Sequence, residues 1–356
     1  MQIATVSFLT VNRMSEITRR KVEHIQAVLE GNATANSVTT GLEHIRFEHN
    51  ALPDLNLCDI DLATDFLGRS IGAPLLISSM TGGPDVAGML NLRIAEASQT
   101  LNIPFGVGSQ RIALEGGSHS GFGPDLRRAA PDVPILANFG AAQLQSWEGP
   151  TMARRAVDMI EADALIIHLN PLQEAVQFGG DTNWGGLLEK IAVVAGSIRV
   201  PVVVKEVGAG ISGAVAKRLC DVGVAAIDVA GVGGTSWAAV EGQRASSGAR
   251  KQTAEVFRDW GISTAEAICQ VRGSCPKTTL IASGGLRDGL DCAKAIRLGA
   301  DLAAMAAGVL PAAMSNTESL VAHLQNIIDQ LRIACFCTGS GDLAQLRCAP
   351  LIASPT

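Results

Sequence analysis

Ala164-Leu-Ile-Ile-His-Leu-Asn170 and Pro201-Val-Val-Val-Lys-Glu-Val207 are short apolar runs that end in polar residues. Runs this apolar, each followed by a helical pattern, are typical of strands buried in a parallel sheet. Six further runs of this kind lie at residues 74–80, 104–108, 134–138, 225–231, 279–284 and 301–306, and the first four of the eight begin 30 residues apart. Eight strand–helix repeats predict an α/β fold of the closed (β/α)8 TIM-barrel type. An open doubly wound sheet is the structural alternative.

Helical patterns fill the gaps between these runs, at residues 87–101, 151–161, 184–196, 212–223 and 290–299. Residues 1–60 precede the first strand and are predicted to form an N-terminal arm with a helix at Arg19–Leu29, whereas residues 61–350 form the barrel domain. The longest gap follows the sixth strand and contains the polar, glycine-containing stretch Glu241–Lys251. We expect a long, lid-like insertion there, because long loops at the catalytic face are usually functional. A disordered insertion is the alternative.

Composition narrows the class of protein. The chain has 356 residues, 47% of them apolar, and a net charge of −6 without a basic block, so a large core is expected and nucleic-acid binding is not. Its eight cysteines are scattered and form no Cys-x-x-Cys motif, which favours reduced thiols over a zinc site. The N-terminus lacks the pattern of a signal peptide, and the longest apolar stretch, Leu302–Met314, is too short to span a membrane. We expect a cytoplasmic protein that binds no membrane.

The ends of the predicted strands are polar, glycine-rich or both. In a TIM barrel the active site lies at the C-terminal ends of the strands. The segments that follow the eight runs are 78–83, 108–111, 138–140, 168–174, 205–208, 231–237, 283–287 and 306–308. The last two belong to neighbouring strands, and backbone N–H groups at Gly284, Gly285 and Ala306–Gly308 predict a phosphate cradle. Glycines that only make tight turns are the alternative.

Lys205 lies inside an apolar strand, and a buried lysine is costly unless it is paired. It could form a Schiff base, stabilise negative charge on a reduced flavin, or join a structural ion pair. Glu206 points to the opposite face of the strand and cannot be its partner.

Two other charged groups also have two interpretations. Glu174 could bind Mg²⁺ together with substrate phosphates, or it could be an acidic residue near the start of a helix opened by Pro171. Arg20 and Lys21 could bind a diphosphate, or they could lie on a solvated helix face.

Taken together, these motifs resemble one family, the type 2 isopentenyl-diphosphate delta-isomerases. The matching pieces are Arg20-Lys-x-Glu-His24, Met80-Thr-Gly-Gly83, Gly108-Ser-Gln-Arg111, Asn138, His168-Leu-Asn-Pro-Leu-Gln-Glu174, Val204-Lys-Glu-Val-Gly208, Gly233-Gly-Thr-Ser-Trp237, Ser283-Gly-Gly-x-Arg287 and Leu331-Arg-x-x-x-x-x-Thr-Gly339. They run from about residue 19 to 347, nearly the whole chain. The fourth-strand motif is the most specific, whereas the last two strand ends are common to many FMN-binding barrels.

The resemblance implies FMN, Mg²⁺ bound by Glu174, NADPH as the reductant of the flavin, and interconversion of isopentenyl and dimethylallyl diphosphate. The FMN contacts that it implies are Ser79, Met80, Thr81, Ser109, Asn138, Lys205, Thr235, Gly285, Leu286, Arg287, Ala306 and Ala307. The substrate contacts that it implies are Arg20, Lys21, Ser109, Gln110, Arg111, His168, Asn170 and Gln173. It further suggests a homotetramer or homo-octamer.

Catalysis, on this resemblance, requires adding one proton to an alkene and removing another nearby. Lys205 would hold charge on the reduced flavin, and Trp237 would stabilise cationic character by a cation–π interaction. Glu241 and Gln173 are the candidates for the second proton transfer. The alternatives are an FMN-dependent barrel oxidoreductase acting on a small hydroxy acid, and a binding protein without activity. The oxidoreductase would need a His or Cys base late in the barrel. The end of the seventh strand and the loop before it contain no His, and His323 lies far beyond the eighth strand.

Overall fold

A closed barrel of eight parallel strands forms the centre of the computed structural model, which describes residues 23–24, 26–29, 33–80, 85–117 and 121–352. The strand order around the barrel is β10-β3-β4-β5-β6-β7-β8-β9. Their bounds are β3 Leu75–Ile77, β4 Phe105–Gly106, β5 Ile135–Gly140, β6 Ala164–Leu169, β7 Val202–Glu206, β8 Ala226–Asp228, β9 Thr279–Ala282 and β10 Leu302–Met305. Each falls on one of the eight predicted runs, and closure between β10 and β3 confirms the barrel over the open sheet.

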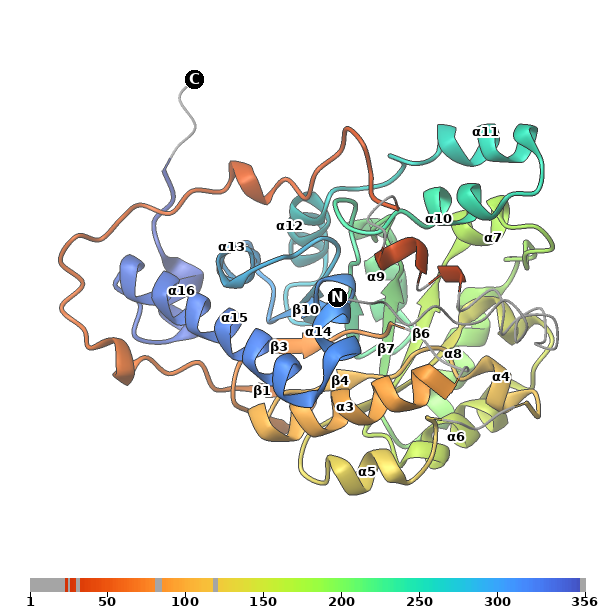
Figure 1. Cartoon of the computed structure of the whole chain (residues 1–356), viewed down its shortest axis with the longest axis horizontal. Helices are drawn as coiled ribbons and strands as arrows, with labels where there is room; N and C mark the ends of the chain where they lie inside the picture. The colour runs from red at the N-terminus through yellow and green to blue at the C-terminus, as the bar shows by residue number, and fades with distance from the viewer. Residues whose placement is uncertain (1–22, 25, 30–32, 81–84, 118–120, 353–356) are drawn as a thin grey trace.

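Helices surround this barrel (Figure 1). The longer ones are α3 Asp85–Leu101, α6 Gly149–Ile160, α8 Leu187–Ser197, α9 Gly213–Asp221, α12 Thr264–Ser274, α13 Gly289–Arg297 and α15 Thr317–Thr338. Shorter ones are α4 Arg111–Leu114, α5 Asp125–Ala129, α7 Pro171–Val176, α14 Leu310–Ser315, α16 Leu343–Cys348 and the 3-10 turns η3 Ala141–Gln145 and η4 Ala307–Val309. The five predicted helical patterns are present, although the one expected from Trp184 begins at Leu187. No helix among the described residues is long and apolar enough to cross a membrane.

Two apolar clusters hold the fold together. The larger lies between the outer face of the strands and the helices. The smaller fills the inside of the barrel with strand residues such as Leu136, Ile166 and Val203, together with Phe66 and Ile71. The last two belong to a hairpin that the sequence did not predict, formed by β1 Thr64–Phe66 and β2 Arg69–Ile71. Both are fully buried, so the hairpin closes the N-terminal end of the barrel.

The described part of the N-terminal segment runs along the outside of the barrel (Figure 1). Its 3-10 turns η1 Leu42–His44 and η2 Leu57–Asp59 contact α13 and α15. Isolated bridges join Phe47 to Leu351 and Thr34 to Thr235. The arm is therefore connected both to the C-terminal segment and to the loop after β8.

The insertion after β8 is present, but its polar stretch is helical. Residues 241–251, predicted as a loop, belong mostly to α10 Trp237–Arg244 and α11 Gly248–Val256, which pack against each other beside α7 (Figure 1). Ser236 and Ser247 cap the two helices by accepting hydrogen bonds from backbone N–H groups. The caps stabilise the helices, and the glycines destabilise them little because they lie at or near the helix ends. Movement of this pair as a lid stays a prediction.

Candidate functional site

A cavity of about 280 Å³ opens at the C-terminal ends of the barrel strands, and all eight strand ends contribute to its lining. The insertion adds Trp237, and the N-terminal arm adds His24 and Val28. The residues that were predicted from the sequence and line the cavity are Ser79, Met80, Ser109, Arg111, Asn138, His168, Asn170, Gln173, Glu174, Lys205, Thr235, Trp237, Gly285, Leu286, Ala306 and Ala307. The cavity therefore brings together most of the residues that were expected to contact FMN, the substrate and the metal.

Three predicted site residues lie elsewhere. Gln110 is fully buried behind the cavity, where its side chain donates to the Ala156 carbonyl and accepts the Asn138 N–H, both at 2.9 Å. The Arg287 side chain is 75% exposed, lies 3.7 Å from Asp291 and does not line the cavity. Glu241 lies one layer behind the lining, in contact with lining residues. Arg20, Lys21 and Thr81 are outside the described residues.

Lys205 is paired in the barrel with a carboxylate on the next strand. Register places Lys205 of β7 opposite Asp228 of β8, and Nζ lies 3.4 Å from Asp228 Oδ2 and donates to the Glu206 carbonyl at 2.9 Å. Ser283 Oγ donates to the other oxygen of Asp228. All three side chains are buried, so the lysine charge is compensated within the protein while Lys205 still lines the cavity.

Glu206 faces away from Lys205, as predicted, and lies in a separate buried position. One carboxylate oxygen accepts the backbone N–H groups of Val207, Gly208 and Ala209. Burial raises the pKa of Glu206 to about 7, although these hydrogen bonds and the Lys205 charge act to lower it. Glu206 therefore anchors the turn after β7 rather than facing the cavity.

The last two strand ends form a glycine-rich turn. Gly284 has φ +104°, and a Cβ atom there would lie 2.1 Å from the Gly231 carbonyl oxygen, so this position requires glycine. The backbone N–H groups of Gly285 and Leu286 donate no hydrogen bond to any described residue. Beside them, η4 begins at Ala307, with one residue between it and the end of β10 at Met305. Backbone donors that face a cavity in this way can bind a phosphate group.

Glu241 connects the insertion, α7 and the N-terminal arm. Its Oε1 lies 3.0 Å from both His24 Nε2 and Gln173 Nε2, and Arg244 contacts Oε2 at 2.6 Å. Trp237 stands edge-on to the His24 ring, with centroids 5.0 Å apart. Burial raises the pKa of Glu241, but the His24 and Gln173 hydrogen bonds and the Arg244 charge outweigh it, so the pKa is lowered. Glu241 is therefore an ionised, buried carboxylate that can accept a proton.

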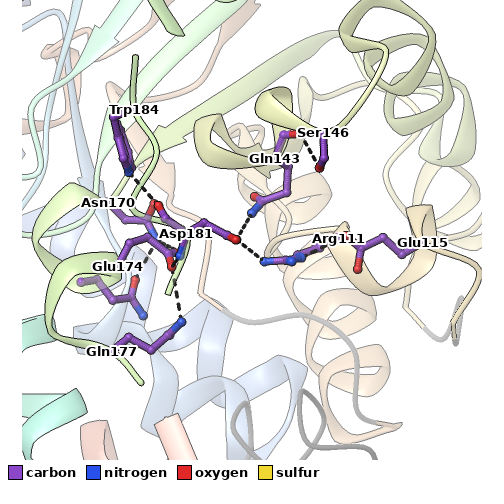
Figure 2. A network of polar contacts seen from close by, with 10 residues as sticks. Arg111, Glu115, Gln143, Ser146, Asn170, Glu174, Gln177, Asp181 and Trp184 are labelled. Atoms are coloured by element: carbon purple, nitrogen blue, oxygen red, sulfur yellow. Dashed lines mark hydrogen bonds and ion pairs between the residues drawn. The ribbon is translucent and has the colours of Figure 1, made fainter. Parts of the chain in front are cut away.

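Glu174 and Arg111 lie in one polar network, with Asp181 between them (Figure 2). The buried Glu174 carboxylate accepts hydrogen bonds from Asn170 Nδ2 at 2.9 Å and from the Asp181 backbone N–H at 2.8 Å. Arg111 Nη1 donates to Asp181 Oδ2 at 2.9 Å. The side-chain oxygen of Asn170, Oδ1, is also buried, and it has no hydrogen-bond partner among the described residues.

Comparison with known sequences shows the family to which the chain belongs. Residues 14–115 and 151–352 match the model of the FMN-dependent dehydrogenases. The isopentenyl-diphosphate delta-isomerase of Xanthobacter autotrophicus is 58% identical over 94% of this chain and 97% of its own length. The chain belongs to the type 2 isopentenyl-diphosphate delta-isomerase family. Another relative of that name, from Stutzerimonas stutzeri, is also 58% identical over the same shares of the two chains.

Solved structures agree with the fold of this isomerase family. A lactate oxidase of Pediococcus acidilactici superimposes with a TM-score of 0.65 over all of this chain and 97% of its own, at 15% identity. A mandelate oxidase superimposes with a TM-score of 0.64 over 99% of this chain and 100% of its own, at 16% identity. At this identity the likeness concerns the barrel alone.

The sequence did not identify Asp228, His24 or Asp181 as site residues. Asp228 carried a signal, because it ends an apolar strand adjacent to the strand with a buried lysine. His24 stood within the Arg20–His24 motif without a role of its own. Asp181 follows two glycines in a polar loop and carried no signal that pattern reading could use.

Proposed function

We propose that this protein interconverts isopentenyl and dimethylallyl diphosphate, with reduced FMN and Mg²⁺ bound in the cavity. The observation that carries the proposal is the cavity itself, in which a compensated lysine and a glycine-rich turn come together with an ionised, buried carboxylate just behind the lining. The 58% identity to a named isomerase over nearly the whole chain supports it.

The residues around the cavity fit FMN. Among the described residues, the backbone N–H groups of Gly285 and Leu286 have no acceptor, so they can donate to its phosphate, and the buried hydroxyl of Ser79, which lines the cavity, has no partner either. Lys205 is the cation that can stabilise negative charge on the reduced cofactor. When bound, reduced FMN would supply electron density and a site for proton transfer next to the alkene.

The residues also fit Mg²⁺ when the substrate contributes ligands. Within the described residues, no three His, Cys, Asp or Glu side chains form a metal cluster. Mg²⁺ commonly binds one carboxylate together with phosphate oxygens and water. Glu174 can be that carboxylate, since its two oxygens together offer about four acceptor sites. Arg111, with Arg20 and Lys21, would hold the diphosphate and keep it from leaving as cationic character develops.

Glu241, which contacts His24, Gln173 and Arg244, is the proposed base for proton removal. Glu241 is kept ionised by His24, Gln173 and Arg244, so it can act as a base. Gln173 lines the cavity and donates to Glu241, whereas Asn170 donates to Gln173 at 3.1 Å. This chain of amides connects the cavity to the carboxylate. Trp237 would face the developing cation with its aromatic ring.

The proposal also includes the conditions under which the enzyme works. NADPH is the proposed reductant of the flavin, and the protein is proposed to act in the cytoplasm as a homotetramer or homo-octamer. The net charge of −6 fits a protein that does not bind nucleic acid.

The test is an anaerobic assay of purified protein with FMN, Mg²⁺ and isopentenyl diphosphate, with and without NADPH or a chemical reductant. We expect dimethylallyl diphosphate to form only when the flavin is reduced. Equal turnover with oxidised flavin would contradict the proposed chemistry. No conversion, together with flavin reduction by a small hydroxy acid, would favour the oxidoreductase instead. Against that alternative, the only histidines among the described residues that line the cavity, His24 and His168, come from the arm and β6.

A further inference from the structure

Asp181 contacts two lining residues of the cavity, Arg111 through its side chain and Glu174 through its main chain. Its Oδ2 accepts hydrogen bonds from Arg111 Nη1 at 2.9 Å and from Gln143 Nε2 at 3.2 Å. Its backbone N–H donates to Glu174 Oε2 at 2.8 Å. Figure 2 shows Asp181 between the two groups, with Arg111 on one side and Glu174 on the other.

The chain reaches this position through a tight turn after α7. Gly179 has φ +67°, and a Cβ atom on Gly180 would lie 2.1 Å from the Glu174 carbonyl oxygen. Only glycine at 180 allows the turn to fold back onto α7 this closely. On the far side, Trp184 Nε1 donates to the Asp181 carbonyl at 2.9 Å. The Asp181 backbone is therefore held at both its N–H and its carbonyl.

Arg111 is held at two of its three nitrogens. Glu115, on the next turn of the chain, accepts from Nε at 3.1 Å, and Asp181 accepts from Nη1. Nη2 donates to no described residue, although Arg111 lines the cavity. A guanidinium fixed in this way loses less side-chain freedom when it binds an anion than a free one does.

We propose that Asp181 is a positioning residue that holds the diphosphate-binding Arg111 and the metal-binding Glu174 in one arrangement, the side chain acting on the first and the main chain on the second. This inference rests on the proposed function, which assigns those roles to Arg111 and Glu174. It follows that Asp181 affects the binding of Mg²⁺–diphosphate and has little effect on the chemical step.

The experiment compares holoenzymes carrying Asp181→Asn and Glu115→Gln. Both substitutions remove a carboxylate that pairs with Arg111, but Glu115 has no contact with Glu174. Binding of inorganic pyrophosphate is titrated calorimetrically with and without Mg²⁺, and kcat and KM are measured with isopentenyl diphosphate. Bound flavin, followed by absorbance, checks that each variant is folded.

We expect Asp181→Asn to weaken Mg²⁺-dependent pyrophosphate binding by about tenfold and to raise KM by a similar factor, because charge-assisted hydrogen bonds are the stronger ones. Its kcat should stay within about twofold of the wild type, since the residue touches no reacting group. Glu115→Gln should change pyrophosphate binding by less than about threefold, because Glu115 lies one turn from Arg111 in the same segment and contacts neither Glu174 nor Gln143.

A second pair of variants separates positioning from general damage. In an Arg111→Gln background, Asp181→Asn should weaken binding no further, because its side chain acts through Arg111. Gly180→Ala should raise the Mg²⁺ concentration needed for pyrophosphate binding, since the added Cβ displaces the turn from Glu174.

Three results would count against the inference. Wild-type affinity in Asp181→Asn, or equal losses in Asp181→Asn and Glu115→Gln, would overturn it while leaving the isomerase intact. An additive loss in the Arg111→Gln background would do the same. A wild-type protein that converts isopentenyl diphosphate but binds no pyrophosphate with Mg²⁺ would overturn the inference alone, whereas one that does neither would contradict the proposed function itself.

Discussion

Two layers of side chains inside the barrel differ sharply although they stand on the same strands. The lower layer contains Leu136, Ile166, Val203, Ala226 and Ile281, and the upper layer contains Asn138, His168, Lys205, Asp228 and Ser283, each two residues further along. Positions two apart on a strand point the same way, so both layers face the inside of the barrel. The hairpin side chains Phe66 and Ile71 close the lower layer from below, whereas the upper layer meets the cavity.

This comparison shows how the fold separates stability from chemistry. The lower layer is apolar and buried, so it contributes stability and a rigid floor beneath the cavity. The upper layer is buried but polar, and its members are satisfied by one another, as Lys205, Asp228 and Ser283 are. A change in the lower layer should therefore leave the chemistry of the upper layer largely intact.

Lys205→Met should have the largest effect on activity. Removing the cation that stabilises charge in the cavity should lower kcat by about 100- to 1000-fold. Because Asp228 would be left buried without its partner, stability should fall as well. The control is Lys205→Met combined with Asp228→Asn, which should recover stability in a thermal melt and remain inactive. Recovery of activity in the double variant would show that the chemistry does not need the Lys205 charge.

Glu241→Gln should lower kcat by about 100-fold or more with little change in KM, because it removes a general base. The variant keeps the size of the side chain and its hydrogen bonding to Gln173. The matched control is Glu255→Gln, on the exposed face of the neighbouring helix α11, which should have no effect.

The pH profile sharpens this prediction. The pKa of Glu241 is lowered from its ordinary value of 4.5, so the base form is lost only when the pH falls below that value. We expect the acid limb of kcat of the wild type to have its midpoint below pH 4.5, provided that the protein is still folded there. A loss of activity with a midpoint near pH 6 would assign the base to another group.

Leu136→Ala should show the reverse pattern to Lys205→Met. The side chain is fully buried in the lower layer, so its truncation should lower the free energy of unfolding by about 2–5 kcal/mol. Because Leu136 lines no part of the cavity, kcat and bound FMN should be unchanged at a temperature where the variant is folded. Denaturant unfolding and steady-state kinetics give the two values, and a large fall in kcat would show that the layers are coupled.

Glu206→Gln should have the smallest effect, confined to stability and dependent on pH. The pKa of Glu206 is raised to about 7 by burial, so the folded protein binds this proton more tightly than the unfolded chain. Stability of the wild type should therefore fall as the pH rises from about 4.5 to above 7. The variant removes this dependence, so its melting temperature relative to the wild type should rise by a few degrees between pH 5 and pH 8. Glu189→Gln, an exposed control on α8, should show no such change.

The strands of the barrel were predictable because each is a short apolar run with its polar residue at the end. The hairpin Thr64–Ile71 was not, since only Phe66 and Ile71 face the core and three residues per strand give too short an alternation. The helices of the insertion were not predicted, because its glycines and polar residues are typical of a loop. The prediction did not take into account that Ser236 and Ser247 can cap helices.

Among the site residues, Lys205 and Glu174 could be selected because a charge in an apolar run, or after a strand, is unusual. Their partners could not. The contacts of Lys205 with Asp228, of Glu241 with His24 and of Arg111 with Asp181 join residues 23, 217 and 70 positions apart. Such pairs depend on strand register and on how the arm and the turn fold back, which local patterns do not encode.

The most direct test of the central claim is isomerisation in D₂O by the anaerobic, reduced holoenzyme with Mg²⁺. The account requires that a proton is added to the alkene in the cavity and another removed by Glu241, so dimethylallyl diphosphate should carry solvent deuterium when examined by NMR. Product formed at the normal rate without any deuterium would mean that hydrogen moves within the substrate, and it would contradict the account.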